Sequence, residues 1–460
     1  MRTLILSSVL LWISVFSIIH TPTFAIKKSY IMYLGSHSHG PDPTSDDQER
    51  ATNSHHEFLA SFLGCIEAAI YDGVDIISAS LGSMEDGEYF EDGMAIGSFH
   101  AMKHGIPVVA AVVNNGPDPS TLGNTAPWLL TVGASTIDRE FVSYVTLGNG
   151  KLLRGVSLSN VGFAPQKLYP LILAADARVP SASAEDASQC SRLNLLDPQK
   201  VKGKILVCIF NKEEKQKTET SSPQTATYAD MSQVDGESLF VYINSTKNPV
   251  AHISEAMAEF KTKPAPMVVD FSARGPCKTE PNIIKPDIIA PGVNIIAAHS
   301  NPRLPYTAVS GTSLSCPHVA GIVGLLKILH PRWTPSAIKS AIMTTATTKY
   351  ANSHPILNGN NEEATPFDYG LGHLRPDLAA DPGLVYDLSV DDYLNFLCAR
   401  GYNEKTISLF STRGSLSCVQ SHPVWQTSTT PRLQLRISMI PSPLLEDLRM
   451  SVNQEHTTRV

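Results

Sequence analysis

The residues with the clearest chemical potential lie in the run GTSLSCPHVAG, residues 311–321, where a serine follows a glycine turn at the start of an apolar helix. The first N–H groups of a helix lack intrahelical partners and carry partial positive charge, which suits a negatively charged oxygen beside a nucleophilic hydroxyl. Ser313 is therefore a candidate nucleophile. Serine and threonine at helix starts are more often simple caps, so the run alone leaves both interpretations open.

The elements that must position this serine alternate between apolar strands and helices. Strands are expected over residues 74–81, 106–113 and 128–134, and helices over 66–72, 91–104, 312–329 and 336–345. Such alternation indicates right-handed βαβ units and a parallel sheet covered by helices on both faces. The sequence thus predicts an α/β fold, and the small and apolar residues of 312–329 predict a helix buried in the middle of the molecule.

A different pattern occupies the middle of the chain. Residues 145–162, 201–209 and 239–243 are typical of strands, and polar loops such as 211–230 separate them. We interpret residues 151–264 as an inserted β-rich domain. The first pattern resumes after Pro266, with a further strand expected over 294–298.

Composition and charge exclude several classes of protein. The chain has 460 residues, 42% hydrophobic and 17% charged, and its net charge of −7 lacks the basic footprint of a nucleic-acid binder. Residues 1–25 combine Arg2, an apolar run and the small-x-small ending Thr23-Phe24-Ala25, a pattern typical of a signal peptide. We expect a secreted protein without membrane contact once the signal is removed, because no later segment is judged long and apolar enough to span a bilayer.

The seven cysteines favour neither a metal site nor a dense disulfide framework. They include no CxxC pair and no zinc spacing, so no metal and no cofactor is predicted. Their odd number leaves at least one thiol free, and the pairing stays open. The sequon Asn244-Ser245-Thr246 predicts a glycan at Asn244, provided that this residue is exposed.

The order of motifs over residues 26–410 resembles the plant branch of the subtilisin-like serine proteases, the subtilases. The run 311–321 is similar to the segment that carries their active-site serine. The other matching segments follow in the family's order: KKSYIMYLGSHSHG (27–40), DGVDIISASLG (72–82), NNGP (114–117), VKGKILVC (201–208), FSARGP (271–276) and YGLGHLRPDLAADPGLVYD (369–387). The resemblance implies a subtilisin-like parallel sheet flanked by helices, a peptide or protein substrate, and an extracellular or cell-wall location.

The resemblance also implies roles for individual residues. Ser313 would form the acyl-enzyme and Asn114 would donate a hydrogen bond to the oxyanion. The strand edge that pairs with the substrate backbone would consist of Ser80, Leu81 and Gly82.

The resemblance implies a division of the chain into domains. The implied parts are a signal peptide (1–25), a partial α/β propeptide that acts as an intramolecular inhibitor (26–64), a catalytic domain in two pieces (65–150 and 265–410), a partial protease-associated insert (151–264) and a divergent tail (411–460).

The chain departs from the family where the Asp and His of the catalytic triad belong. It contains no Asp-Ser-Gly or Asp-Thr-Gly, and its His-Gly pairs, at His39 and His104, are better explained as a surface residue and a helix end. Gly64 is followed directly by Cys65, which indicates a truncated or internally deleted member with an incomplete sheet. Val113 stands where the family usually has glycine, and His318 is expected to pack within its helix.

Two functional hypotheses follow. The first is a secreted serine endopeptidase by descent, with Ser313 as nucleophile but without turnover in this form, because a serine hydroxyl without a base is a poor nucleophile. The second is a non-catalytic secreted protein that binds peptides or proteins through the retained strand edge or the insert.

Overall fold

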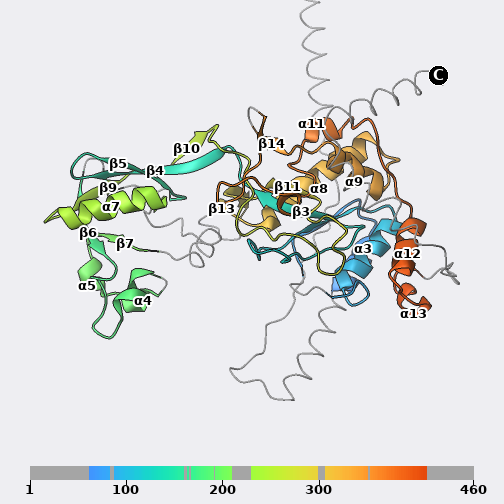
Figure 1. Ribbon diagram of the computed structural model, residues 1–460, viewed down its shortest axis with the longest axis horizontal. Coiled ribbons are helices and arrows are strands. Elements are labelled where there is room, and N and C mark those ends of the chain that lie inside the picture. Colours follow the sequence, from blue (N-terminus) through green and yellow to red (C-terminus); the bar gives the residue numbers. More distant parts are fainter. Residues whose placement is uncertain are drawn as a thin grey trace, which may run out of the picture. The chain divides into compact units, whose positions relative to one another are not determined.

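The computed structural model describes residues 62–82, 87–159, 163–164, 167–190, 192–209, 229–298, 306–350 and 353–411 (Figure 1). The predicted signal peptide, almost all of the predicted propeptide, most of the 211–230 loop and nearly the whole predicted tail lie outside the described residues.

A parallel sheet forms the centre of the fold and confirms the predicted α/β class. Its order is β1-β2-β3-β11, and every neighbouring pair is parallel. The strands are β1 (Ile77–Ala79), β2 (Val108–Ala111), β3 (Leu130–Ser135) and β11 (Ile288–Pro291). The first three match predicted strands, although β1 is shorter than the predicted 74–81 and its central residue, Ser78, is exposed.

Helices cover both faces of this sheet, as the alternating pattern predicts. Residues of α8 (Thr312–Leu329) and α9 (Pro335–Thr344) share one core with the side chains of Val109 and Ala111. The intervening Val108 and Ala110 are also buried and point to the opposite face, which α3 (Gly93–Lys103) covers. Asp92 caps α3 and Thr334 caps α9, each through its side chain.

A further helix, Phe62–Tyr71, precedes β1 and packs beside α3. It runs unbroken through Gly64 and Cys65, the point where the sequence indicates a missing block. Its Ile66 lies so close to Gly97 of α3 that a Cβ on Gly97 would be 2.8 Å from Ile66 Cδ1. The helix Phe62–Tyr71 and α3 therefore lie side by side on the same face of the sheet.

A second sheet, largely antiparallel, lies between β3 and β11 in the sequence (Figure 1). Its order is β7-β6-β9-β4-β5-β8, with β10 paired to β4. Its strands are β4 (Arg139–Leu147), β5 (Leu152–Val156), β6 (Tyr169–Leu173), β7 (Ile205–Val207), β8 (Asp230–Met231), β9 (Val250–Ile253) and β10 (Met257–Phe260). The sheet begins twelve residues before the predicted insert boundary of 151, because β4 and β5 form one antiparallel pair.

The expected strand at 239–243 is wrong, because these residues belong to α7 (Gln233–Ser245). Ser232 caps the helix by accepting from the N–H of Asp235. Leu239 and Tyr242 are buried against the sheet, whereas Val241 is exposed, which is helical rather than strand periodicity. A short apolar run does not by itself distinguish the two structures.

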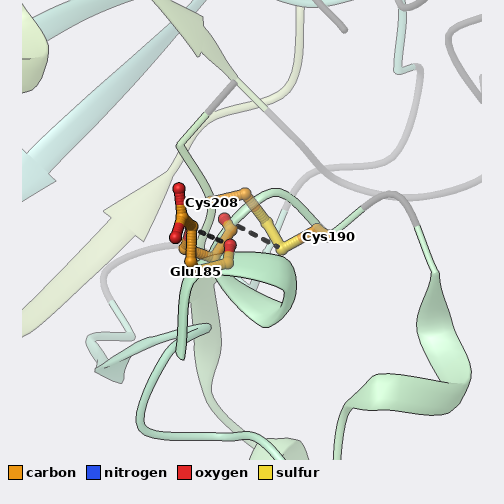
Figure 2. The surroundings of a disulfide bond; sticks show 4 residues. Glu185, Cys190 and Cys208 are labelled. Atoms are coloured by element: carbon orange, nitrogen blue, oxygen red, sulfur yellow. Dashed lines mark hydrogen bonds between the residues drawn. A yellow bond between two sulfur atoms is a disulfide. The ribbon is translucent and has the colours of Figure 1, made fainter. Parts of the chain in front are cut away.

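A disulfide joins Cys190 and Cys208 in this second region (Figure 2). It ties the end of α4 (Ala184–Ser188) to the residue that follows β7. Three further cysteines, Cys65, Cys277 and Cys316, are free thiols.

Short elements complete the described residues. The expected strand 294–298 is β12 (Ile295–Ala298), which pairs only with β13 (Tyr306–Val309) and lies outside the parallel sheet. The remaining elements are η1 (Leu193–Leu195), α5 (Pro198–Val201), β14 (Lys349–Tyr350), β15 (His354–Pro355), α10 (Pro366–Tyr369), α11 (Pro376–Ala379), α12 (Val390–Ala399) and α13 (Glu404–Ile407).

The expectation that α8 is buried all round is wrong. Its buried residues form the stripe that faces the sheet, whereas Leu325, Ile328 and Leu329 are 56%, 75% and 59% exposed. By length and mean hydropathy α8 also passes as a membrane span, contrary to the expectation for segments after the signal. Its packing against the sheet is that of a core helix with one side uncovered.

A fully buried ion cluster ties β11 to β3 and α9. Asp287 lies between two ammonium groups, with Lys285 Nζ 2.7 Å and Lys339 Nζ 2.9 Å from its carboxylate oxygens. The N–H of Thr131 also donates to this carboxylate, at 2.7 Å. Burial lowers the pKa of Lys285 to about 7, against the opposing effect of Asp287. Asp287 thus stabilises the core by pairing with both buried lysines.

We expect Asp287→Asn to destabilise the protein by about 3–5 kcal/mol, because it leaves two buried lysines without a counter-ion. Lys285→Met should cost less, since Lys339 still pairs with Asp287. Urea unfolding would measure both free energies. The control is Asp377→Asn, which removes an exposed pair with Arg375 and should change the free energy of unfolding by no more than about 0.5 kcal/mol. Equal values for Asp287→Asn and the control would contradict this account.

Candidate active site

Ser313 lies in the first turn of α8, beside the end of β1. Its Oγ lies 3.5 Å from the carbonyl oxygen of Ser80, and the Oγ of Ser80 donates to the carbonyl oxygen of Ser313 at 2.8 Å. This reciprocal contact joins the start of α8 to the residue after β1. The structure thus brings together Ser313 and Ser80, two of the residues that the sequence nominates.

The side chain of Asn114 is fixed by the neighbour of Ser313. Both the backbone N–H and the hydroxyl of Thr312 donate to Asn114 Oδ1, each at 2.9 Å. Because the oxygen is occupied, the amide Nδ2 remains to donate elsewhere. A Cβ built on Gly311 would lie 3.6 Å from Asn114 Nδ2 and 3.7 Å from the backbone nitrogen of Ser313. Asn114 Nδ2 and the backbone nitrogen of Ser313 therefore border the same small space beside Gly311.

Gly311 keeps this space free. Its φ of 156° and ψ of 157° lie in a region that is essentially restricted to glycine. A side chain here would strain the backbone and would also occupy the space between the two donors.

The segment Leu81–Gly82 is held by an asparagine that the sequence analysis missed. The buried Asn124 donates from Nδ2 to the carbonyl oxygens of Leu81 and Ala111, each at 2.7 Å, so it joins the ends of β1 and β2. A Cβ on Gly82 would lie 2.8 Å from Asn124 Nδ2 and 2.8 Å from Val113 Cγ1. Position 82 therefore accepts glycine alone. The only sequence signal for Asn124 is its place after Gly123, in a turn.

Val113 carries backbone strain directly before Asn114. Its φ is +77°, a conformation that glycine adopts readily and a β-branched residue rarely does. Its side chain packs on the cluster of Val112, Leu122, Ala273 and Cys277 and lies against Gly82. The side chain of Val113 thus contributes packing at a position where its backbone conformation is unfavourable.

No base accompanies Ser313 among the described residues, where the hydrogen-bond partner of its Oγ is Ser80. His318 is exposed, contrary to expectation, and its Nδ1 faces the carbonyl oxygen of Leu314 at 2.7 Å. His104 lies at the end of α3, as expected. His373 is partly buried, and desolvation of its ring lowers its pKa to about 4; its Nδ1 faces the carbonyl oxygen of Leu374. His39 lies outside the described residues.

Asn244 lies in the last turn of α7 and is exposed. A glycan at Asn244 requires that the side chain be exposed, and the exposure of Asn244 satisfies this requirement.

The fold and the site together define a class. A parallel α/β sheet that sets a serine at the start of a core helix, next to an asparagine amide, has the layout of a serine hydrolase, in which backbone and side-chain N–H groups stabilise the oxyanion.

Comparison with protein families matches residues 58–372 to the subtilase family. The chain is 46% identical over 397 residues to the subtilisin-like protease SBT5.4 of Arabidopsis thaliana, covering 79% of this chain and 51% of that protein. It is 39% identical over 389 residues to the CO(2)-response secreted protease of Arabidopsis thaliana, covering 76% of this chain and 50% of that protein. The chain spans about half the length of the curated relatives it matches. It belongs to the subtilase family of subtilisin-like serine proteases.

We expect Val113→Gly to be more stable than Val113→Ala by about 1 kcal/mol. Both variants remove the two methyl groups of the valine, but only glycine relieves the strain of the positive φ. The matched control is Val109 in β2, which has no positive φ. There the glycine variant should be less stable than the alanine variant by about 0.5–1 kcal/mol. Chemical denaturation of the four variants checks the reversal. The same order at both positions would show that Val113 is unstrained.

Proposed function

We propose that this chain is a secreted protein with a serine-endopeptidase cleft that binds extended peptides but does not turn them over. By descent its chemistry is peptide-bond hydrolysis through an acyl-enzyme on Ser313. In this form the chain would retain the oxyanion donors and the peptide-binding edge that this chemistry needs, but it would lack the proton acceptor.

One observation carries the proposal: Ser313 Oγ contacts the carbonyl oxygen of Ser80 and, among the described residues, no imidazole or carboxylate. A serine hydroxyl needs an adjacent base to become nucleophilic at neutral pH. In subtilisin itself, removal of the triad costs about a million-fold in kcat, and a remainder of roughly 10³–10⁴ over water comes from binding and the oxyanion hole. The sequence agrees with this observation, because it lacks the family's Asp and His motifs and Gly64 is followed directly by Cys65.

Peptide binding draws on parts of the site that remain. Ser80, Leu81 and Gly82 continue from the end of β1, and Asn124 holds this segment in place. An extended peptide or protein segment would add to it as a strand through backbone hydrogen bonds. Asn114 Nδ2 and the N–H of Ser313 would then donate hydrogen bonds to the carbonyl oxygen of the peptide residue that lies beside the Ser313 hydroxyl.

The remaining parts of the chain fit a secreted member of the family. We assign residues 1–25 to a signal peptide, 26–64 to a partial inhibitory propeptide and 151–264 to a partial protease-associated insert, with a glycan at Asn244. The two catalytic pieces are 65–150 and 265–410, and 411–460 form a divergent tail. The name of one relative, a CO(2)-response secreted protease, supports an extracellular location.

The test uses a fluorophosphonate, which reacts with activated serines, together with a peptide-hydrolysis assay. We expect the wild-type chain to show no more labelling and no more hydrolysis than Ser313→Ala, because the hydroxyl has no base. A fluorescent peptide should nevertheless bind, and Asn124→Ala should weaken its binding by about tenfold or more, since the segment Leu81–Gly82 loses its support.

Ser340→Ala serves as the control, because Ser340 is buried in α9 and its hydroxyl accepts a hydrogen bond from the N–H of Tyr386 rather than lying beside Ser313. It should leave peptide binding unchanged. Hydrolysis by the wild-type chain that disappears in Ser313→Ala would overturn the proposal, because a proton acceptor would then be present.

A further inference from the structure

We propose that His100 forms a proton-dependent link, which as an imidazolium ion holds residues 404–411 on α3 and loosens them when it loses a proton. We call residues 404–411 the α13 segment. The link joins three parts of the chain: the helix Phe62–Tyr71, α3 and the α13 segment. It lies apart from Ser313, and the proposal does not depend on whether Ser313 reacts or binds peptide.

The α13 segment docks on α3 mainly through one aromatic side chain. Phe410 is fully buried, and its ring meets the rings of Phe99 and Trp128 edge to face, with centroids 5.4 Å and 5.6 Å away. Phe99 belongs to α3, and Figure 1 shows α13 beside α3. A helix as short as α13 is not stable by itself in water. The segment therefore depends on its contacts with α3.

His100, in the last turn of α3, contacts an acceptor with each ring nitrogen. Its Nε2 lies 2.7 Å from the carbonyl oxygen of Leu409, in the α13 segment. Its Nδ1 contacts a carboxylate oxygen of Glu67, in the helix Phe62–Tyr71. A neutral imidazole has one N–H, whereas the imidazolium ion donates from both nitrogens. Both acceptors are therefore satisfied only when His100 is protonated.

Loss of the proton leaves His100 with one donor for two acceptors. If the remaining hydrogen is on Nδ1, the lone pair of Nε2 faces the carbonyl oxygen of Leu409; if it is on Nε2, the lone pair of Nδ1 faces Glu67. Either arrangement loses a charge-assisted hydrogen bond. Histidine commonly changes its charge between about pH 5 and pH 8. The α13 segment is thus held firmly in mild acid and is looser as the pH rises.

The charged groups around His100 favour this direction. Glu67 contacts the ring directly and stabilises its positive charge. Lys103, one turn further along α3, opposes that charge, and its Nζ donates to the carbonyl oxygen of Phe410 at 3.5 Å. The α13 segment faces the ring with an uncharged carbonyl, and its own charged residues, Glu404 and Lys405, are exposed. The contact of Lys103 and the burial of Phe410 remain after His100 loses its proton, so the segment loosens without leaving α3 altogether.

Hydrogen exchange of the full chain, read by mass spectrometry on a fragment that covers the α13 segment, tests the link. The N–H groups of Leu409, Phe410 and Ser411 donate to carbonyl oxygens of α13, at 3.2, 2.9 and 3.1 Å, so their exchange reports opening of the segment. After correction for the intrinsic effect of pH on amide exchange, the wild type should lose about tenfold in protection between about pH 5.5 and pH 8. The amides of α12 should show no such loss.

Three variants separate the proton from the packing. His100→Gln cannot gain a proton, so its α13 segment should have the low protection at both pH values. The matched control is His104→Gln, which changes an exposed histidine at the end of α3 and should keep the response of the wild type. Glu67→Gln should still respond, but with its midpoint at lower pH, because an amide does not stabilise the imidazolium ion. A purely structural contact would not move that midpoint.

The amides of β2 should stay protected in every variant, which shows that each is folded. Equal pH responses of the wild type and His100→Gln would overturn the proposal, as would protection of the wild-type segment that does not change with pH. If His100→Gln loses the protection of β2 as well, an unchanged midpoint in Glu67→Gln overturns the proposal instead. None of these outcomes depends on labelling or peptide binding at Ser313, so failure here is distinct from failure of the proposed function.

Discussion

The packing of α8 onto the parallel sheet is the contact on which the rest of the structure depends. Val319, Val323 and Leu326 of α8 bury the face formed by Val109, Val132 and Ile288. Because parallel strands end at the same edge, this packing brings the start of α8 to the residues that follow β1 and β2. Ser313, Asn114 and the segment after β1 are separated by up to 233 residues in the chain and meet for this reason alone.

The packing of α8 on the sheet leaves part of the helix surface uncovered. One side of α8 packs on the sheet, Gly324 and Lys327 lie against the two residues before β1, and Leu325 and Ile328 are exposed. Ser313 and the exposed residues Leu325 and Ile328 thus belong to the same helix, which packs on the parallel sheet. The helix Phe62–Tyr71 runs unbroken through Gly64 and Cys65, the point where the sequence predicts a missing block.

At two positions the residue type is unfavourable for its backbone conformation or its burial, and the surrounding packing holds it there. Val113 holds a positive φ with a β-branched side chain, next to the buried cluster of Val112 and Leu122. Asp287 is buried with Lys285 and Lys339, whose side chains also donate to the carbonyl oxygens of residues 127 and 129 before β3. Val113 lies just after β2 and Asp287 just before β11, so both adjoin central strands of the sheet.

The sequence by itself determined the α/β class and three of the four parallel strands, because hydrophobic periodicity is a local signal. It also determined the starts of α8 and α9 and the run that contains Ser313, because caps and glycine turns are local signals as well. The tertiary structure alone decided that residues 239–243 are helical and that one side of α8, including His318, is exposed. It also decided that Thr312 holds the side chain of Asn114 and that Asn124 holds the segment Leu81–Gly82. Burial, and the partner of a polar side chain, depend on which distant segments arrive at the same place, and no local pattern of residues contains that information.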